Sequence, residues 1–594
     1  MRLVEILIMT LAGVWQGIRQ DFNLFEIFLV AAGVWAWNKK GWRPRPFRPR
    51  QLHLTRTPRR PWVAAVALIA GVIALRLALI PLLPVPTPIV TDEFSHLLLA
   101  DTLLHGRVAN PTHPFWQHFE SLHILQQPHY VSSYFPGHAL VLAAGILVLH
   151  SAWAGVLAEC AVFLGILYWA LRGWMPSRWA LFGVLLAALR FAIGSYWVNA
   201  YHGGFLPAAG GALIFGAFAR LRKRASFSHG LVSQSLVSQG LVIGLGLAIL
   251  AGTRPFEGLA FALPLVAMLA WEFRTRFSAL ARIAIPAVAV AGIAVVGLGV
   301  YFTHVTGSPF VTAYQISQKT YGWPMGLAWT PTPRIEHSHI ELARYYNYEI
   351  GEREKVDGPI DFVEYLTFRL QEYWRFFLGP ALTLPLIMLP RVWKRRPILF
   401  AGLAGGLAAI LLEGAASPHY LAPAAAVIVA ILVECCRHLN ASRVRIVPLL
   451  PAVMALVLVL RIGAETAGLP YTQKLNFQSW CCRVEGNLNK ARIAATLRGI
   501  PGDHLVFVKT KTDEMNLFQW IYNDADIDHS RIAWARDLGA DRNRELQAYF
   551  AARQVWLADP NVEPATCVRY DAASSVTSET VSRSNMPRPQ PDRQ

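Results

Sequence analysis

The sequence predicts an all-α polytopic membrane protein of about 11–13 transmembrane helices that ends in a small α/β soluble domain. Hydrophobic residues make up 54% of the chain and charged residues only 15%, whereas soluble domains carry about 25% charged residues. Runs such as 62–83 and 283–303 reach the roughly 20 apolar residues that cross a bilayer. After residue 462 the hydropathy falls, and patterns typical of helices and strands alternate.

The net charge of +18 indicates which loops of the chain face the cytoplasm. Basic clusters separate the hydrophobic runs, as the positive-inside rule expects of cytoplasmic loops in contact with anionic membrane lipids. No basic patch is interleaved with stacking aromatic residues, so a nucleic-acid partner is not expected. The clusters lie at 39–60, 220–224, 274–282, 391–396 and 437–445.

In chain order, residues 1–61 are expected to form an apolar hairpin or interfacial helices followed by a basic cytoplasmic linker, and 62–462 the transmembrane domain. The run 137–171 is long enough for two helices, but one long or kinked crossing keeps its two ends on opposite sides. The outer loops are expected at 84–136 and 304–375. Spans are predicted near 62–83, 137–171, 178–195, 204–219, 238–253, 258–271, 283–303, 376–390, 397–413, 420–436 and 446–462.

Residues 463–571 are expected to fold as the α/β domain, and the Ser-, Thr- and Pro-rich tail 572–594 to be disordered. Helices are predicted at 487–498 and 541–552, and strands at 504–509, 531–534 and 554–557. Cys481, Cys482 and Cys567 share this outer segment, where a disulfide is permitted, but the sequence leaves their pairing open. The acidic turn 523–528 lacks the glycine of a calcium loop and is interpreted as a solvated turn.

Thr91-Asp92-Glu93 stands just beyond the first long span. One interpretation is purely local: Thr91 caps a helix over 92–105, and the two acids favour its positive end. That helix could also lie on the membrane surface. The other interpretation is functional, because an acidic pair at a membrane boundary is costly to desolvate. His96 lies one turn from Asp92 on the same helix face, which supports the functional interpretation.

Further candidates follow in both outer loops. His113, His118, His123 and His129 have no compact metal-binding spacing, and each is interpreted as a hydrogen-bonding loop residue. Together with Asp92, Glu93 and Glu120 they could still form a site for a divalent ion such as Mg²⁺ or Mn²⁺. Pro136-Gly137 marks a turn into the next span, where Tyr134 and His138 are expected to face the same cavity as the acids.

Arg254 and Glu257 lie in a Pro- and Gly-containing break between two spans, which is tolerated only against protein or a wet cavity. They could form an ion pair that fastens a turn, or Arg254 could bind a phosphate with its planar guanidinium. A comparable short outer turn holds Glu413, His419 and Tyr420. Lys319 and Arg334 are further phosphate-binding candidates.

Asp92-Glu93, then His105-Gly106-Arg107, then Tyr134-Phe135-Pro136-Gly137 resemble the GT-C superfamily of membrane glycosyltransferases, and most closely bacterial relatives of the dolichyl-phosphate-mannose protein mannosyltransferases. The resemblance covers 62–462 and implies Asp92 as catalytic base or metal partner, with Glu93 second. The family's further acid is missing from 195–204, where Asn199 and His202 are the candidate replacements. The expected substrate-binding residues are His96, Arg107, Tyr134, His138, Asn199, His202, Arg254, Glu257, His419 and Tyr420.

The chemistry follows from the outward-facing site. Nucleotide sugars are absent there, so we expect a sugar on a polyprenyl phosphate as donor and a hydroxyl of a glycan, lipid or protein as acceptor. Asp92 would take the acceptor's proton during a single, inverting displacement. The predicted protein is a hexosyl- or pentosyltransferase of a bacterial inner membrane, with its active site and C-terminal domain facing the periplasm. A transporter or flippase of a lipid-linked glycan and a non-catalytic envelope-assembly scaffold are the alternatives.

Overall fold

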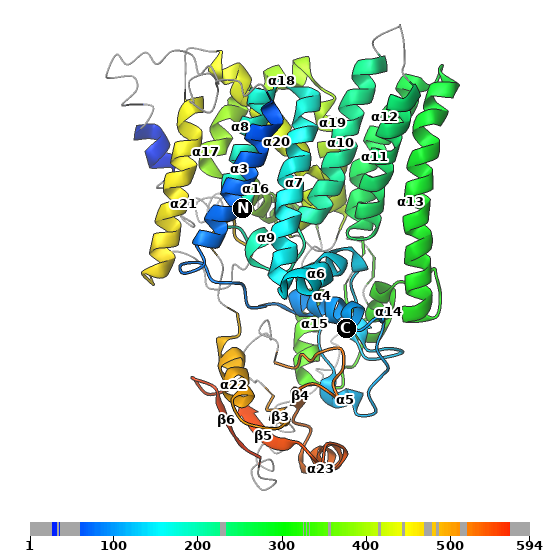
Figure 1. The fold of residues 1–594 in the computed structure, drawn as a ribbon, viewed down its shortest axis with the longest axis vertical. Coiled ribbons are helices and arrows are strands. Elements are labelled where there is room, and N and C mark those ends of the chain that lie inside the picture. The colour runs from blue at the N-terminus through cyan, green and yellow to red at the C-terminus, as the bar shows by residue number, and fades with distance from the viewer. Residues whose placement is uncertain are drawn as a thin grey trace.

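A bundle of helices stands above a smaller domain that contains a β-sheet, and the long axis of the molecule runs through both (Figure 1). The computed structural model describes residues 26–32, 35, 60–225, 233–324, 326–327, 330–331, 333–354, 358–413, 417–441, 446–468, 478–482, 486–510 and 520–570. Most of the predicted N-terminal hairpin, its basic linker and the predicted disordered tail therefore lie outside the described residues.

Seven helical segments of the described residues are long and apolar enough to cross a membrane, or eight if one pair bent by 96° counts as a single span. The chain is thus a multi-pass membrane protein. The spans are α3 (Pro61–Ala78), α7 (Ala152–Trp174), α11 (Ser233–Ala251), α12 (Pro255–Phe273), α13 (Phe277–Thr306), η4 with α20 (Pro418–Ala424, Ala425–Asn440) and η5 with α21 (Val447–Leu449, Leu450–Thr466). The bent pair is α16 (Pro359–Phe377) with the segment from α17 to α18 (Gly379–Thr383, Leu389–Arg395) joined by η3 (Leu384–Met388).

This number is smaller than the 11–13 spans expected from hydropathy. Two predicted spans fold as helices too short to cross alone, α8 (Ser177–Phe191) and α19 (Leu399–Leu412). The predicted span 376–390 is broken, because Gly379 has a positive φ of 65° and prolines follow it. The predicted span 204–219 is the first part of α10 (Phe205–Ala225), whose basic C-terminal turn lowers its mean hydropathy.

The run 137–171 was expected to be a single long or kinked crossing. It forms two helices instead, because the chain reverses at His150, which has left-handed backbone angles. The first, α6 (Pro136–Leu149), has only 14 residues and packs back on α7. α6 lies beside α4 (Thr91–Leu104) at the end of the bundle that faces the smaller domain (Figure 1). Of these two helices only α7 is long enough to cross a membrane, so the run supplies one candidate span.

α10 lies at the centre of the bundle, where it contacts α7, α11, α12, α20 and η4. Its Gly211 touches the carbonyl of Pro423 so closely that any Cβ would overlap that carbonyl. This close approach brings η4, which carries His419 and Tyr420, against the centre of the bundle.

The two large outer segments fold over this end of the bundle. The first contains α4, α5 (Trp116–Phe119), β1 (Ile124–Leu125) and β2 (Val131–Ser132), and the second contains α14 (Ala313–Tyr321) and α15 (Ile340–Glu354). Between the bundle segments α8 and α10 lies the short α9 (Tyr196–Asn199). Phe94, Leu98 and Leu99 of α4 are buried in protein, so α4 is not a helix on the membrane surface.

The C-terminal domain has a four-stranded mixed sheet in the order β4-β3-β5-β6. β3 (His504–Val508) pairs in parallel with β4 (Ile532–Arg536) and β5 (Gln554–Asp559), and β6 (Thr566–Arg569) adds an antiparallel edge. The two helices are α22 (Leu488–Arg498) and α23 (Ala540–Tyr549). The three predicted strands and two predicted helices are confirmed within a few residues, but β6, short and mostly exposed, was missed.

The C-terminal domain is fastened to both outer segments. The amide of Ala525 donates to Asp101 at 2.7 Å, and the rings of Phe94 and Tyr522 lie 4.7 Å apart. Arg536 donates to the carbonyl of Glu120 at 3.2 Å and forms an ion pair with Glu341. The segment before β4 therefore contacts α4, and one of these contacts, at Phe94, lies directly after the two acids of its first turn.

The cysteines are now assigned. Cys481 and Cys482 are bonded to each other, and Cys567 on β6 is a free thiol rather than the partner of either. In the turn 523–528, Asp528 lies 3.1 Å from His113 and accepts from Tyr549 at 3.1 Å. The turn therefore links the first outer segment, through His113, to α23 of the C-terminal domain, through Tyr549.

Candidate functional site

The two adjacent acids of α4 have different surroundings. Val90, not Thr91, is the N-cap, and Glu93 closes the first turn by accepting the amides of Ile89 at 3.0 Å and Val90 at 3.3 Å. Its other oxygen accepts the amide of Tyr201 at 2.9 Å, and the side chain is fully buried. Glu93 therefore organises backbone, and the expectation that it is a reserve base or metal partner does not fit this geometry.

The carboxylate of Asp92, unlike that of Glu93, is partly open to solvent. Its side chain is 32% exposed, and its Oδ2 lies 3.8 Å from Nε2 of His202. Burial, opposed by the charge of Arg254 and reinforced by that of Glu93, raises the pKa of Asp92 to about 7. A carboxylate with such a pKa is suited to accept a proton near neutral pH.

His202 is positioned by the two peptide groups that flank Tyr201, the residue before it. The amide of Tyr201 is held by Glu93, and its carbonyl lies 3.0 Å from Nε2 of His138. Nδ1 of His138 lies 2.8 Å from the buried carboxylate of Glu159 on α7. Gly203 has φ of 79°, and a Cβ there would overlap the His138 ring. Glu93 and His138 thus fix the segment that brings His202 to Asp92.

A continuous series of side chains leads from Asp92 to Arg254. The rings of His202 and His419 are 5.5 Å apart, and those of His419 and Tyr420 are 4.8 Å apart. The guanidinium of Arg254 lies 4.2 Å above the centre of the Tyr420 ring. The site therefore brings together Asp92, Arg254 and His419. Successive members of this set lie more than a hundred residues apart in the sequence.

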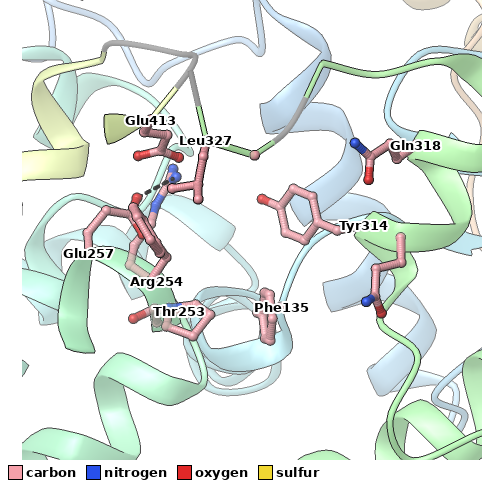
Figure 2. A pocket seen from close by; sticks show the side chains of 12 residues that line it. Phe135, Thr253, Arg254, Glu257, Tyr314, Gln318, Leu327 and Glu413 are labelled. Carbon is pink, nitrogen blue, oxygen red and sulfur yellow. Dashed lines mark hydrogen bonds and ion pairs between the residues drawn. The ribbon is translucent and has the colours of Figure 1, made fainter. Parts of the chain in front are cut away.

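Arg254 opens onto a pocket of about 270 Å³. It is the N-cap of α12, and its NH1 lies 3.4 Å from Glu257 one turn later. Figure 2 shows Arg254, Glu257 and Glu413 on one side of the pocket, Tyr314 and Gln318 on the other, and Phe135 and Thr253 between them. Pro255, Phe256 and Leu327 also line it. The pocket thus combines one cation, two carboxylates and an apolar edge at the end of a membrane span.

An aromatic group packs against α4 one turn after Asp92. His96 stacks on Tyr134 at 4.7 Å and meets the edge of His138 at 5.1 Å. Tyr134 in turn contacts Tyr314 of the pocket wall at 5.5 Å. Burial, with the nearby charges of His138 and Arg254, lowers the pKa of His96 well below its usual range. His96 is therefore a neutral packing residue one turn after Asp92.

The loop histidines have separate hydrogen-bonding partners. His113 contacts Asp528, His118 the carbonyl of Arg536, His123 the hydroxyl of Tyr345, and His129 the carbonyl of Val305. Among the described residues, no three His, Cys, Asp or Glu side chains converge to hold a metal ion. With Glu93 engaged by three amides, the donor set around Asp92 does not fit the divalent ion considered from the sequence.

Four other candidates lie away from the pocket. Arg107 follows the far end of α4, about 20 Å from Asp92 at 1.5 Å per residue. The side-chain oxygen of Asn199 accepts hydrogen bonds from Nε and Nη2 of Arg76, at 2.9 and 2.6 Å, and its amide nitrogen donates to two backbone carbonyls. With both ends engaged, Asn199 cannot replace the missing acid. Lys319 is exposed, and the exposed Arg334 is paired with Glu354 at 2.8 Å.

The sequence interpretation missed the roles of several residues. Glu159 is the single acid within the apolar run 137–171, and an ionisable residue inside a span is itself a signal. Tyr314 and Gln318 face the pocket from the same side of α14, one turn apart. Nothing in one sequence indicates that the backbone of Tyr201 would be held by two side chains.

Comparison with known proteins gives structural matches only. No family model matches the chain, and no curated protein does. The structure of ArnT from Cupriavidus metallidurans in the apo state matches with 13% identity and a TM-score of 0.46, covering 84% of this chain and 93% of that one. ArnT bound to undecaprenyl phosphate matches with 12% identity and a TM-score of 0.46, covering 83% and 93%.

The archaeal oligosaccharyltransferase AglB from Archaeoglobus fulgidus, in complex with an inhibitory peptide and a dolichol-phosphate, matches with 12% identity and a TM-score of 0.34, covering 84% and 69%. The chain is thus structurally similar, at low identity, to membrane proteins that bind polyprenyl phosphates. These values assign no role to any of its residues. The closer resemblance to protein mannosyltransferases stays a prediction.

Proposed function

We propose that this protein transfers a sugar from a polyprenyl-phosphate donor to an acceptor hydroxyl, on the side of the membrane that carries the C-terminal domain. The observation that carries the proposal is that a partly exposed acid with a raised pKa, Asp92, is joined through His202, His419 and Tyr420 to a largely buried cation, Arg254, and that Arg254 lines a pocket at the start of a membrane span. In a bacterium that side is the periplasm of the inner membrane.

The donor would bind both the cationic part and the apolar part of the pocket. The phosphate would meet Arg254, whose planar guanidinium suits phosphate oxygens. The polyprenyl chain would leave along the apolar edge formed by Phe135, Pro255 and Phe256. Since Glu257 and Glu413 also lie beside Arg254, the phosphate would compete with Glu257 for the same cation.

The reaction would be a single displacement. The acceptor oxygen attacks the anomeric carbon, the bond from that carbon to the phosphate oxygen breaks, and polyprenyl phosphate leaves with the bonding electrons. Asp92 receives the proton of the acceptor hydroxyl, and His202 lies close enough to influence it. Phosphate needs cationic stabilisation more than protonation when it leaves, and Arg254 supplies it. The anomeric configuration is inverted.

The test is transfer by the purified protein from a panel of polyprenyl-phosphate sugars to candidate acceptors, comparing the wild type with Asp92→Asn. The expected result is release of polyprenyl phosphate by the wild type and loss of that release in the variant. Full turnover by Asp92→Asn would refute the base assignment. Lipid scrambling in vesicles without any transfer would favour the flippase alternative and refute the proposed reaction.

A further inference from the structure

A second pocket lies at the opposite end of the span that carries His419. η4 begins beside the site, and α20 continues the span to Asn440. Near that C-terminal end is a pocket of about 400 Å³, lined by Trp179 of α8, Arg395 and Arg396 at the end of α18, and Glu434, Arg437, His438 and Asn440 of α20. α18 lies at the end of the bundle away from the C-terminal domain (Figure 1).

The charge of this pocket is unbalanced. Three guanidinium groups, those of Arg395, Arg396 and Arg437, face one carboxylate, the buried Glu434. NH1 of Arg437 donates to Glu434 at 2.6 Å, and Nε of Arg396 lies 3.8 Å from the same oxygen. Glu434 thus orders two of the cations but neutralises only one charge. The lining keeps a net positive charge, which attracts an anion.

The surroundings of the pocket are those of a membrane interface. Trp179 lines it, and Trp393 on α18 is 55% exposed. Tryptophan is enriched where spans meet the lipid headgroups. Ile387, on the turn before α18, is 73% exposed, so the segment that ends at Arg395 also offers exposed apolar side chains to acyl chains.

We infer that this pocket binds the phosphate headgroup of an anionic phospholipid, in the leaflet opposite the Asp92 site. Basic pockets between membrane helices bind such headgroups through charge and hydrogen bonds. Guanidinium groups can each present two donors to one phosphate, and here Glu434 holds two of them in place. A soluble phosphate would satisfy the cations but leave the neighbouring apolar surface unused. The inference does not depend on sugar transfer.

The chain offers a matched pair of variants. Arg395 lines the pocket and is exposed, so Arg395→Gln removes a charge without leaving Glu434 unpaired. Lys394 is its exposed neighbour, does not line the pocket and carries the same charge. Binding of phosphatidylglycerol and phosphatidylcholine to the full-length detergent-solubilised protein would be measured by native mass spectrometry.

We expect phosphatidylglycerol to bind at least tenfold more tightly than phosphatidylcholine. Arg395→Gln should weaken phosphatidylglycerol binding by about fivefold, while Lys394→Gln changes it by less than about twofold. Arg395→Lys, which keeps the charge, should recover part of the loss. Equal effects of the two glutamine variants would reduce the pocket to general surface attraction and overturn the inference, as would equal binding of both lipids.

A third arm separates the sources of phosphate. Inorganic phosphate at about 10 mM would be added during the lipid titration and, separately, during thermal unfolding of delipidated protein; charge alone predicts only weak binding at this salt. The expected result is neither displacement of phosphatidylglycerol nor stabilisation. Displacement of the lipid together with stabilisation by phosphate alone would identify a free-phosphate site and overturn the lipid assignment.

Discussion

Two carboxylates from different regions of the first outer segment, Glu120 after α5 and Asp92 at the start of α4, differ in almost every respect. Glu120 is 5% exposed and accepts hydrogen bonds from Tyr321 at 3.1 Å and from Ser338, with His339 at 3.2 Å. Asp92 is 32% exposed, and the closest ion-pair distance is the 3.8 Å to His202. Burial alone would raise the pKa of both, yet the hydrogen bonds at Glu120 outweigh burial and lower its pKa, whereas Asp92 titrates at about 7.

The difference teaches how to separate structural from reactive acids in this fold. Donors that converge on a carboxylate fix its charge and join the elements that supply them. Glu120 joins the first outer segment to the loop before α15, and its carbonyl joins the C-terminal domain. Asp92 lacks such a set of donors and retains affinity for a proton. Glu93, its neighbour, belongs with Glu120 in this respect.

The largest effect should come from Asp92→Asn. An amide cannot take the acceptor's proton, so transfer should fall by about 10²–10⁴-fold, with no loss of thermal stability. The measurement is release of polyprenyl phosphate. Asp101→Asn is the control, since Asp101 is on the same helix but binds the amide of Ala525. Comparable losses in both variants would remove the distinction between the two carboxylate environments.

Next in size is Arg254→Gln. Loss of a buried cation that faces the leaving phosphate should reduce kcat/KM for the donor by about 10–100-fold, and Arg254→Lys should restore only part of it because the planar fork is lost. Arg334→Gln is the control, an exposed arginine paired with Glu354. Thermal unfolding must be followed in parallel, because Arg254→Gln leaves Glu257 without its ion pair. If donor kinetics were unchanged in a folded variant, Arg254 would have no part in phosphate binding.

Glu120→Gln should lower stability and leave activity unchanged, the opposite of what is expected for Asp92→Asn. Removing the charge that three donors converge on should lower the free energy of unfolding by about 1–3 kcal/mol, while the folded fraction keeps its transfer rate. Denaturant or thermal unfolding in detergent measures the first, and activity per folded protein the second. A stable but inactive Glu120→Gln would place Glu120 in the reaction and break the comparison.

The smallest effects are those of pH. If Asp92 is the base, the transfer rate should rise with pH and level off above about 7. Because its folded pKa is raised, Asp92 contributes stability below its unfolded pKa that is lost as pH rises through about 7. The pKa of Glu120 is lowered, so its contribution is present above the unfolded value and lost as pH falls through the folded one. Thermal unfolding of the wild type and Asp92→Asn from about pH 5.5 to 8.5 should therefore converge at the acidic end.

Part of this could be predicted from the sequence. Hydropathy located most spans, and alternation located the β3, β4 and β5 strands; Arg254, His419 and Tyr420, all expected to bind substrate, lie in one series of contacts. Hydropathy does not reveal whether an apolar run is continuous, so the breaks at His150 and Gly379 were missed. The division between Asp92 and Glu93 depends on the amide of Tyr201, which lies far along the chain. Likewise, Asn199 differs from His202 through its contact with Arg76, a residue more than a hundred positions away in the sequence.

The two peptide groups that flank Tyr201 have a consequence for motion. The amide N–H of Tyr201 lies in the plane shared with Ala200 and is held from α4 by Glu93, and its carbonyl lies in the plane shared with His202 and is held from α6 by His138. A displacement of either helix would therefore pull on one of two successive planes and carry His202 with it. Asp92 begins on the same turn as Glu93, so the acid and its neighbouring imidazole would travel together. Their spacing should therefore survive rearrangements that open or close the pocket around them.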